Sequence, residues 1–298
     1  MGDAGVGTKC DSCGDTGCSA HTRDEHESQG EFEQRQRLHS ALCRIDHKVV
    51  VMSGKGGVGK STVAVNIATA LMMSGKRVGL LDVDVHGPSV PTMLGLEGIT
   101  PMSRSGSIIP VEYDGIRVMS VGFLLKDADS AVVWRGPLKA GVIRQFLSDV
   151  AWGDLDYLIV DSPPGTGDEP LSVCQLIEDV DGAVIVTTPQ KVAAVDVRKS
   201  ITFCQQLGVP VLGVLENMSG FACPHCGEIT HILSAGGGET TAREMGVPFL
   251  GSLPIDPAIA EAGDAGRVFV HREPDSPVAQ LMVQAVQRAI DAVEPGNR

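Results

Sequence analysis

The sequence predicts an α/β fold with a predominantly parallel central sheet that carries helices on both faces. Short runs of Val, Ile and Leu recur along the chain with few polar residues inside them, as in parallel strands buried on both sides. Helical stretches separate these runs, which is the order found in sheets covered by helices. With 43% hydrophobic and only 4% aromatic residues, the 298-residue chain can bury a sizeable, mostly aliphatic core.

A short polar helix over residues 31–44 is expected to lead into the domain. Strands are predicted at residues 49–53, 77–84, 116–121, 157–162, 183–188, 211–216 and 249–253. Helices are predicted at residues 61–74, 137–150, 193–207 and 278–293. The last helix has an apolar face and no basic enrichment on its polar face, so we expect it to pack on the core. No linker divides the chain after residue 45, and residues 31–298 are expected to form one domain.

Residues 1–30 differ in composition from the rest of the chain. They contain Cys10, Cys13 and Cys18, several Gly and Ser, and two basic against six acidic side chains. Little of this segment could form a core, so we expect a flexible extension unless a metal ion orders it.

The overall charge narrows the classes of partner. The formal net charge of −13 argues against nucleic acid or an anionic membrane surface as the main partner. No apolar stretch reaches the roughly 18–20 residues of a membrane span, and the first residues lack the pattern of a secretory signal. We therefore expect a cytoplasmic protein whose eight cysteines are mostly reduced. Cysteines at CxxC spacing then indicate metal or redox chemistry more than disulfides.

A phosphate-binding loop is predicted at residues 52–62, MSGKGGVGKST, between a strand and a helix. Its glycines let backbone N–H groups point at phosphate oxygens, and the helix N-terminus adds a favourable dipole. Lys60 is expected to reach the β- and γ-phosphates of ATP, and the Ser61 hydroxyl to ligate Mg²⁺. The residues expected to hold the nucleotide are Gly54, Gly56, Gly57, Val58, Gly59, Lys60, Ser61 and Thr62.

A second lysine, Lys55, gives this loop the sequence KGGVGKS. The loop resembles the deviant Walker A loop of the ParA/MinD/nitrogenase-iron-protein class. The resemblance implies ATP-dependent dimerisation, in which Lys55 contacts the nucleotide of the partner subunit. In the alternative, Lys55 only neutralises phosphate within its own subunit. The class also places a residue at the position of Asn217 against the adenine, and a plain turn-forming Asn is the alternative there.

Carboxylates follow two of the predicted strands. In DVDVHG (82–87), an Asp at the carboxyl end of the strand can orient a Mg²⁺-bound or attacking water. The resemblance implies that Asp84 positions the water and that Asp82 lies on the Mg²⁺ side, unless one of them only caps the turn. In YLIVDSPPGTGD (157–168), Asp161 would hold the Mg²⁺ shell through water, and the following loop would sense the γ-phosphate.

Two thiols, Cys223 and Cys226, stand at CxxC spacing in ENMSGFACPHCGE (216–228). Such a pair can be a redox dithiol, half of a zinc site or half of an iron–sulfur site. Zinc takes four tetrahedral ligands, and a [4Fe–4S] cluster commonly takes four thiolates. Two chains related by a two-fold axis would supply four thiolates, so the pair makes sense in a homodimer whose cysteine loops face each other.

Several segments together resemble the Mrp/Nbp35/ApbC family of P-loop ATPases, which assemble or carry iron–sulfur clusters. The similarity spans about residues 45–295, and its most specific parts are the two-lysine loop and ENMSGF-x-CPHCG. The resemblance implies an ATP hydrolase with a labile [4Fe–4S] cluster that bridges two subunits on Cys223 and Cys226. It also implies cluster donors and apo iron–sulfur proteins as partners.

The N-terminus departs from the family pattern. One branch of the family carries four cysteines there for a second cluster, whereas this chain has three, Cys10, Cys13 and Cys18. The alternatives to a second metal site are a flexible tail with incidental thiols and a relay that receives or hands over a cluster. A fourth ligand would have to come from outside the chain or from Cys43, His21 or His26.

Other functions compete with the cluster carrier. A positioning ATPase of the ParA/MinD kind would bind DNA or a membrane, but the net charge of −13 and the CPHC motif weigh against it. A zinc-bridged structural dimer would use the same cysteines, and the sequence does not separate zinc from iron. An ATP-using amide ligase or kinase would have no evident use for the CPHC motif. Cys174 and Cys204 are expected in the core, and His86 is expected to pack in the switch region.

Overall fold

The computed structural model describes residues 23, 26–125, 136–177, 179–222 and 229–294 of the chain. These residues fold around one nine-stranded sheet, with a two-stranded ribbon beside it. Within the described ranges, no helix is long and apolar enough to span a lipid bilayer.

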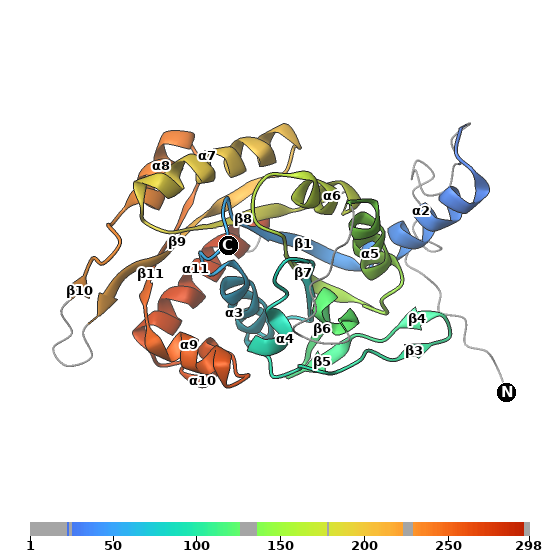
Figure 1. The fold of residues 1–298 in the computed structure, drawn as a ribbon, viewed down its shortest axis with the longest axis horizontal. Helices are drawn as coiled ribbons and strands as arrows, with labels where there is room; N and C mark the ends of the chain where they lie inside the picture. Colours follow the sequence, from blue (N-terminus) through green and yellow to red (C-terminus); the bar gives the residue numbers. More distant parts are fainter. Residues whose placement is uncertain (1–22, 24–25, 126–135, 178, 223–228, 295–298) are drawn as a thin grey trace.

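The sheet runs through the centre of the molecule (Figure 1). Its strands are β1 (Ile45–Met52), β2 (Val78–Asp82), β5 (Val111–Tyr113), β6 (Ile116–Ser120), β7 (Leu155–Asp161), β8 (Gly182–Thr187), β9 (Val211–Ala222), β10 (Ile229–Thr230) and β11 (Phe249–Ile255). They lie in the order β10–β9–β8–β1–β7–β2–β6–β5, and β11 pairs with β9. All pairings except β5 with β6 and β10 with β9 are parallel, which confirms the predicted fold class. The ribbon consists of β3 (Ser103–Arg104) and β4 (Ser107–Ile108).

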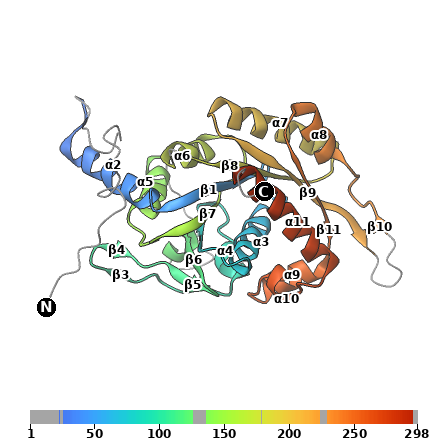
Figure 2. The ribbon, with the colours of Figure 1, turned by 180° about the vertical axis from the view of Figure 1, so that it is seen from behind.

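Helices cover both faces of the sheet (Figures 1 and 2). They are α2 (Gln29–Leu42), α3 (Lys60–Met73), α4 (Val90–Met93), α5 (Gly136–Ser148), α6 (Asp168–Leu176), α7 (Lys191–Gln206), α8 (Gly237–Met245), α9 (Pro257–Asp264), α10 (Phe269–Arg272) and α11 (Pro277–Val293). On one face, α3 contacts β1, β2 and β7, and α11 contacts β9 and β11. On the other face, α7 contacts β8 and β9, and α8 contacts β9. A 3₁₀ turn, η2 (Val121–Leu124), follows β6.

The core lies between the sheet and these helices. Every residue of β2 and of β8 is buried, as expected for parallel strands covered on both sides. The largest fully buried side chains include Trp152, Tyr157, Phe146 and Phe269. α11 buries Val278, Met282 and further residues of its apolar face, which confirms the expected core packing of this helix.

The predicted elements are observed, with ends shifted by a few residues. β1 begins earlier than predicted because Ile45 pairs with Leu155 of β7. β9 continues past the predicted strand 211–216 to Ala222, because its second half pairs with β11 and β10. No range was predicted for the short elements α4, α6, α8, α9, α10, β3, β4, β5 and β10, whose apolar patterns are too brief to show a clear period.

Asn66 connects α3 to α10. Its side-chain amide donates to the carbonyl oxygen of Thr62 at 2.8 Å, and its Oδ1 accepts from the N–H of Val270 at 3.1 Å. The residue is only 3% exposed. Asn66→Ala should leave the Val270 N–H without its partner and lower the free energy of unfolding by about 1–3 kcal/mol, measured by urea unfolding. Gln287→Ala, at an exposed position of α11, is the control and should change stability by less than about 0.5 kcal/mol. Equal losses in the two variants would contradict this role of Asn66.

Candidate functional site

The loop between β1 and α3 needs glycine at two positions. Gly59 precedes α3 with a φ of 83°, and a Cβ there would lie 2.3 Å from Nδ2 of Asn217. At Gly54, a Cβ would lie 2.6 Å from the backbone oxygen of Asp196 in α7. The loop is therefore closely packed from two sides, by β9 and by α7, and side chains would not fit.

The N-terminus of α3 is left open. No side chain caps this end, and its first turn contains no acidic residue. The first N–H groups of a helix have no intrahelical acceptor, and the helix dipole adds positive potential at that end. Phosphate oxygens are suitable acceptors for such groups. The loop over residues 54–62 thus has the form that phosphate binding requires.

The three carboxylates singled out in the sequence meet beside this loop. β2 and β7 are neighbours, with Asp82 opposite Asp161 in the register. Nζ of Lys60 lies 2.5 Å from Oδ1 of Asp161 and 3.5 Å from Oδ2 of Asp84. All four side chains are buried. Lys60 therefore supplies the positive charge that two buried carboxylates need, at the mouth of the phosphate loop.

Asp161 fits a Mg²⁺ ion best among these residues. Its Oδ2 atom is buried and has no hydrogen-bond partner. Leaving a buried carboxylate oxygen without a partner is costly, and Mg²⁺ prefers oxygen ligands and retains several of its waters. Ser61 directly follows Lys60 at the start of α3. The donor set fits a hydrated Mg²⁺ ion held by Ser61, with Asp161 behind its water shell.

Asp82 has a different environment from Asp84. The Ser120 hydroxyl donates to Oδ2 of Asp82 at 2.8 Å, and the N–H of Asp84 donates to Oδ1 at 3.1 Å. Burial, and after it the charge of Asp161, raises the pKa of Asp82 to about 8. These contacts fit the alternative in which Asp82 caps the turn after β2. Asp84 is the one of the two that contacts Lys60.

Lys55 and Asn217 hydrogen-bond within the chain. Nζ of Lys55 donates to Oε1 of Gln190, the N-cap residue of α7, at 3.3 Å. Nδ2 of Asn217 donates to the carbonyl oxygen of Val58 at 2.9 Å, and its Oδ1 accepts from the N–H of Met218 at 3.0 Å. Asn217 therefore fastens β9 to the phosphate loop, a contact that the sequence does not indicate.

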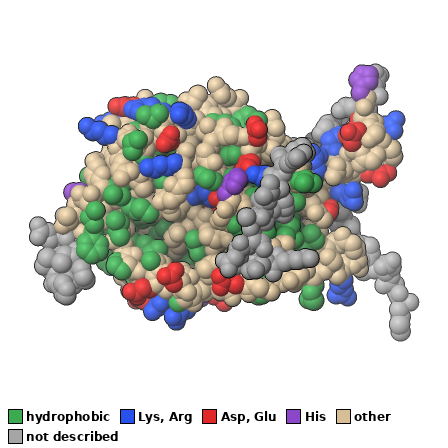
Figure 3. Space-filling model, in the orientation of Figure 1, with side chains coloured by type: hydrophobic (Ala, Val, Ile, Leu, Met, Phe, Trp, Pro, Cys, Tyr) green, Lys and Arg blue, Asp and Glu red, His purple; other side chains and the backbone are tan. Residues whose placement is uncertain are grey.

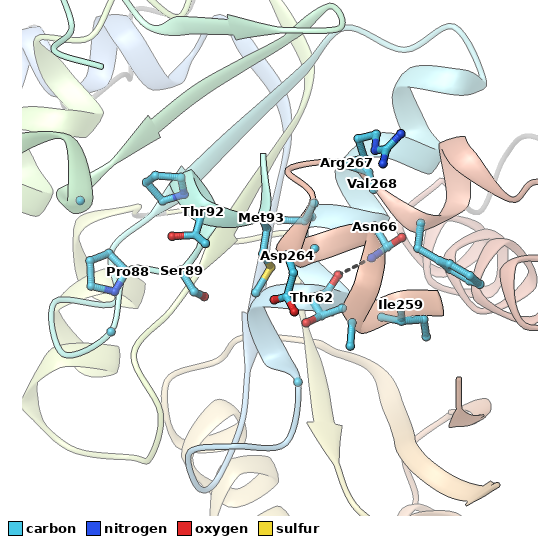
Figure 4. A pocket seen from close by; sticks show the side chains of 18 of the residues that line it. Thr62, Asn66, Pro88, Ser89, Thr92, Met93, Ile259, Asp264, Arg267 and Val268 are labelled. Carbon is cyan, nitrogen blue, oxygen red and sulfur yellow. Dashed lines mark hydrogen bonds between the residues drawn. The ribbon is translucent and has the colours of Figure 1, made fainter. Parts of the chain in front are cut away.

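A cavity of about 1010 Å³ opens beside the phosphate loop (Figure 4). Gly59, Thr62 and Asn217 line it on the side of the loop. Thr92 comes from α4 and Ile259 from α9, and in the figure they lie on either side of Thr62. Small-molecule sites measure roughly 300–1,000 Å³, so the cavity is large enough to hold the nucleoside of ATP. On the outer surface of the molecule, hydrophobic side chains gather over β9 and β11 (Figure 3).

A charged cluster joins the two loops that follow β2 and β7. Glu169, in the first turn of α6, hydrogen-bonds with the buried Lys139 of α5, and its Oε1 lies 3.1 Å from Nε2 of His86. The backbone N–H of His86 donates to Oδ1 of Asp84 at 3.2 Å. No motif pointed to Lys139 or Glu169. His86, expected to pack in the switch region, instead exposes its ring and contacts both of them.

The pKa of Glu169 has opposing causes. Burial raises it, but the hydrogen bonds from Lys139 and His86 outweigh burial and hold it below its ordinary value. Folding therefore favours the charged form. Its contribution to stability is fully present above the ordinary pKa of 4.5 and is lost as the pH falls through the lowered value.

Glu169→Gln should therefore lower the free energy of unfolding more at about pH 7 than at about pH 4. Urea unfolding of the wild type and the variant at both pH values measures this difference. Glu261→Gln, at an exposed position of α9, is the control and should show no such dependence. A loss that grows toward acid pH would rule out the charged cluster as its source.

The predicted metal-binding cysteines lie outside the described residues. They are Cys10, Cys13, Cys18, Cys223 and Cys226. The described segments next to them, α2 and the paired ends of β9 and β10, lie at opposite ends of the molecule in both views (Figures 1 and 2). Within the described part of the chain, no group of three or more His, Cys, Asp or Glu residues is placed to hold a metal ion.

Two other cysteines are core residues, as expected. Cys174 and Cys204 are buried. Burial raises the pKa of Cys174 to about 11 and, with a small effect of Cys174, that of Cys204 to about 12. Thiols with such pKa values are poor nucleophiles and poor metal ligands at neutral pH.

Known proteins with similar structures bind nucleotides. The fold is similar to that of the nucleotide-binding protein of Archaeoglobus fulgidus in complex with ADP, in which Co was found. The TM-score is 0.72 at 42% identity, covering 83% of this chain and 95% of that one. The cell-division ATPase MinD of Pyrococcus furiosus has a TM-score of 0.61 at 24% identity, over 83% and 99% of the chains, which shows a shared fold alone.

Sequence relatives handle iron–sulfur clusters. The chain is 48% identical over 287 residues to the iron-sulfur cluster carrier protein of Methanocaldococcus jannaschii, covering 96% of this chain and 97% of that one. It is 50% identical over 256 residues to the human cytosolic Fe-S cluster assembly factor NUBP2, covering 84% and 94%. Residues 44–290 match the model of a ParA family described as NUBPL iron-transfer P-loop NTPase. Together with the phosphate loop and its carboxylates, these matches confirm the resemblance found in the sequence: the chain belongs to the NUBPL iron-transfer P-loop NTPases of the ParA family.

Proposed function

We propose that this protein is an ATP-dependent scaffold and carrier that binds a [4Fe–4S] cluster between two subunits and transfers it to apo iron–sulfur proteins. One observation carries the proposal. β9 is fastened to the phosphate loop by Asn217, and the CxxC pair, Cys223 and Cys226, directly follows its last residue, Ala222. In this proposal, the same strand connects the phosphate loop to the two cysteines. The names of the carrier and assembly-factor relatives support this reading.

ATP binding is assigned to the phosphate loop. Lys60 moves its contacts from Asp161 and Asp84 to the β- and γ-phosphates, and the backbone N–H groups of residues 54–62 hold the phosphate oxygens. Ser61, and Asp161 through water, would hold a Mg²⁺ ion, which supplies positive charge to the phosphates when bound. Asp84, once released from Lys60, orients the water that attacks the γ-phosphate. The reaction is hydrolysis of a phosphoanhydride by positioning and charge stabilisation.

The cluster is the cargo of this cycle. A single chain offers two thiolates at CPHC, so a homodimer supplies the four that a [4Fe–4S] cluster commonly takes. Lys55 reaches the nucleotide of the partner subunit, which makes dimerisation depend on ATP. Cys10, Cys13 and Cys18 are assigned to a second metal site in the N-terminal extension. The partners are cluster donors and apo iron–sulfur proteins in the cytoplasm, without nucleic acid or membrane.

Lys60→Ala should weaken ATP binding by at least about tenfold, because a hydrogen bond to a charged group contributes about 1.5–3 kcal/mol. Isothermal titration calorimetry with Mg-ATP measures the affinity, and circular dichroism checks that the variant is folded. Lys199→Ala is the control, since that side chain is 65% exposed and its acidic neighbour, Asp196, lies 4.0 Å away. Tight ATP binding by a folded Lys60→Ala protein would sink this assignment.

Anaerobic iron–sulfur reconstitution tests the carrier function. The wild type and the Cys223→Ala/Cys226→Ala variant are compared by visible absorption, by iron, sulfide and zinc content, and by mass in solution. We expect about one four-iron cluster per dimer, lost in the double variant. Cys174→Ala/Cys204→Ala is the control, because these thiols are buried and should not matter for the cluster.

The other outcomes separate the competing functions. Iron retained by the Cys223→Ala/Cys226→Ala variant would assign a second site to the N-terminal cysteines. Wild type that takes up only zinc would favour a zinc-bridged structural dimer. Wild type that takes up no metal, and binds DNA in a salt-dependent way with ATP, would favour a positioning ATPase.

A further inference from the structure

β9 continues beyond the end of its neighbour β8 at the nucleotide cavity. From Val211 to Glu216 it pairs with β8, which ends at Thr187. Beyond Glu216 its pairings are with β11 on one stretch and with β10 near its end. The second half of the strand therefore extends past β8, and Figure 1 shows it projecting from the rest of the sheet toward β10.

The strand bulges where this extension begins. Asn217 pairs with Leu253 and Phe221 pairs with Ile255, so four steps along β9 match two steps along β11. Met218, inside the bulge, has a φ of 59°. This left-handed conformation is disfavoured for a residue with a large side chain, and bulges of this kind occur at functional sites.

The residues around the bulge have two roles. Asn217 and Met218 of β9 line the nucleotide cavity, and so does Ile255 of β11. Ile255 also pairs with Phe221, two residues before Cys223. A ligand in the cavity therefore touches the same residues that hold the end of β9 in place.

The sheet side of the bulge is anchored. Glu216 is 1% exposed, and its carboxylate accepts from the N–H of Gly238 at 2.7 Å and from that of Gly236 at 3.3 Å. These glycines begin α8, to which the chain returns after β10. With Glu216 fixed to α8 and Asn217 fixed to the phosphate loop, a change at the bulge moves the extension and leaves the sheet in place.

We propose that the bulge at residues 218–220 is a relay that couples nucleotide occupancy of the cavity to the position of the end of β9, and thereby to the reactivity of Cys223 and Cys226, which follow β9 in the sequence. Asn217 contacts the phosphate loop and therefore responds to its state. Met218, which has a left-handed conformation, is the residue whose backbone can adopt a second arrangement. The pairing of Ile255 with Phe221 transmits this change to the end of β9. A nucleotide shifts such an equilibrium only if it binds the two arrangements differently. Because Met218 and Ile255 line the cavity, a bound nucleotide contacts them differently in the two arrangements, and this gives the difference in affinity. The inference rests on the proposed function in one respect, since it takes the cavity to be the nucleotide site.

Reactivity of the two thiols tests the relay without any cluster. The full, reduced, metal-free chain is treated with iodoacetamide, and peptide mass spectrometry follows each cysteine separately. The reaction is run without nucleotide, with Mg-ADP and with a non-hydrolysable Mg-ATP analogue. Couplings between sites commonly reach fivefold or more, so we expect the alkylation rate of Cys223 and Cys226 to change by about fivefold between these states. Cys204, which is fully buried, serves as the unreactive internal reference.

Met218→Gly should reduce this response, because glycine adopts positive and negative φ about equally and so removes the strain that separates the two arrangements. The Mg-ATP affinity of this variant is measured by calorimetry alongside, because Met218 lines the cavity. Met218→Asn is a second variant that should change the response in the same direction, since Asn tolerates the left-handed conformation and keeps a Cβ. Ser105→Gly is the matched control. Ser105 also has a positive φ, of 52°, but lies in the exposed turn of the β3–β4 ribbon, outside the cavity lining.

The outcomes distinguish the relay from the proposed function. Wild type that binds nucleotide, by calorimetry, without any change in thiol rates would overturn the relay and leave the carrier function standing. Wild type that binds no nucleotide would overturn both. A Met218→Gly chain that responds like the wild type, or a Ser105→Gly chain that loses the response, would overturn the role of the bulge.

Discussion

The ion pair between Lys60 and Asp161 is the interaction on which the candidate site depends. Parallel pairing of β2 with β7 places Asp82 beside Asp161, and both strands end at the same edge of the sheet. Buried carboxylates on neighbouring strands destabilise the fold unless a positive charge or a proton accompanies them. Lys60 supplies the positive charge to Asp161. Burial, and after it the charge of Asp161, raises the pKa of Asp82 and so favours its protonated form. A phosphate group entering the loop competes for the same lysine.

The phosphate loop is touched from three directions, and each contact leads to a different part of the molecule. α7 packs on Gly54 through Asp196, β9 packs on Gly59 through Asn217, and the acidic loop after β2 meets Lys60 through Asp84. That acidic loop continues into the cluster formed by His86, Glu169 and Lys139 on α6 and α5. These contacts connect the phosphate loop to α7, to β9 and, through His86, to α6 and α5. Of these elements, β9 is the one that the CxxC pair follows in the sequence.

The fold is shared more widely than the function. MinD of Pyrococcus furiosus has the same architecture at 24% identity, and an architecture by itself does not assign an activity. The relatives at about half identity are named for iron–sulfur cluster carriage and assembly, and their similarity extends over most of this chain. The feature of this chain to which we assign the proposed role is local. It is the long end of β9 with the cysteine pair that follows it in the sequence.

The order of residues along the chain was enough to predict the features that are local. Buried strands show as apolar runs, and the phosphate loop is one contiguous segment whose glycines and lysines have fixed spacing, so the residues alone predict both. Asp84 and Asp161 could be singled out because each ends such a run. The contacts between distant segments depend on the three-dimensional arrangement: Asn217 on the phosphate loop, Glu169 with Lys139, and the bulge at Met218. These features have no sequence signature. A buried hydrogen bond or a strained backbone depends on which strands are neighbours in the fold, and the pattern of residues within one segment does not indicate those neighbours.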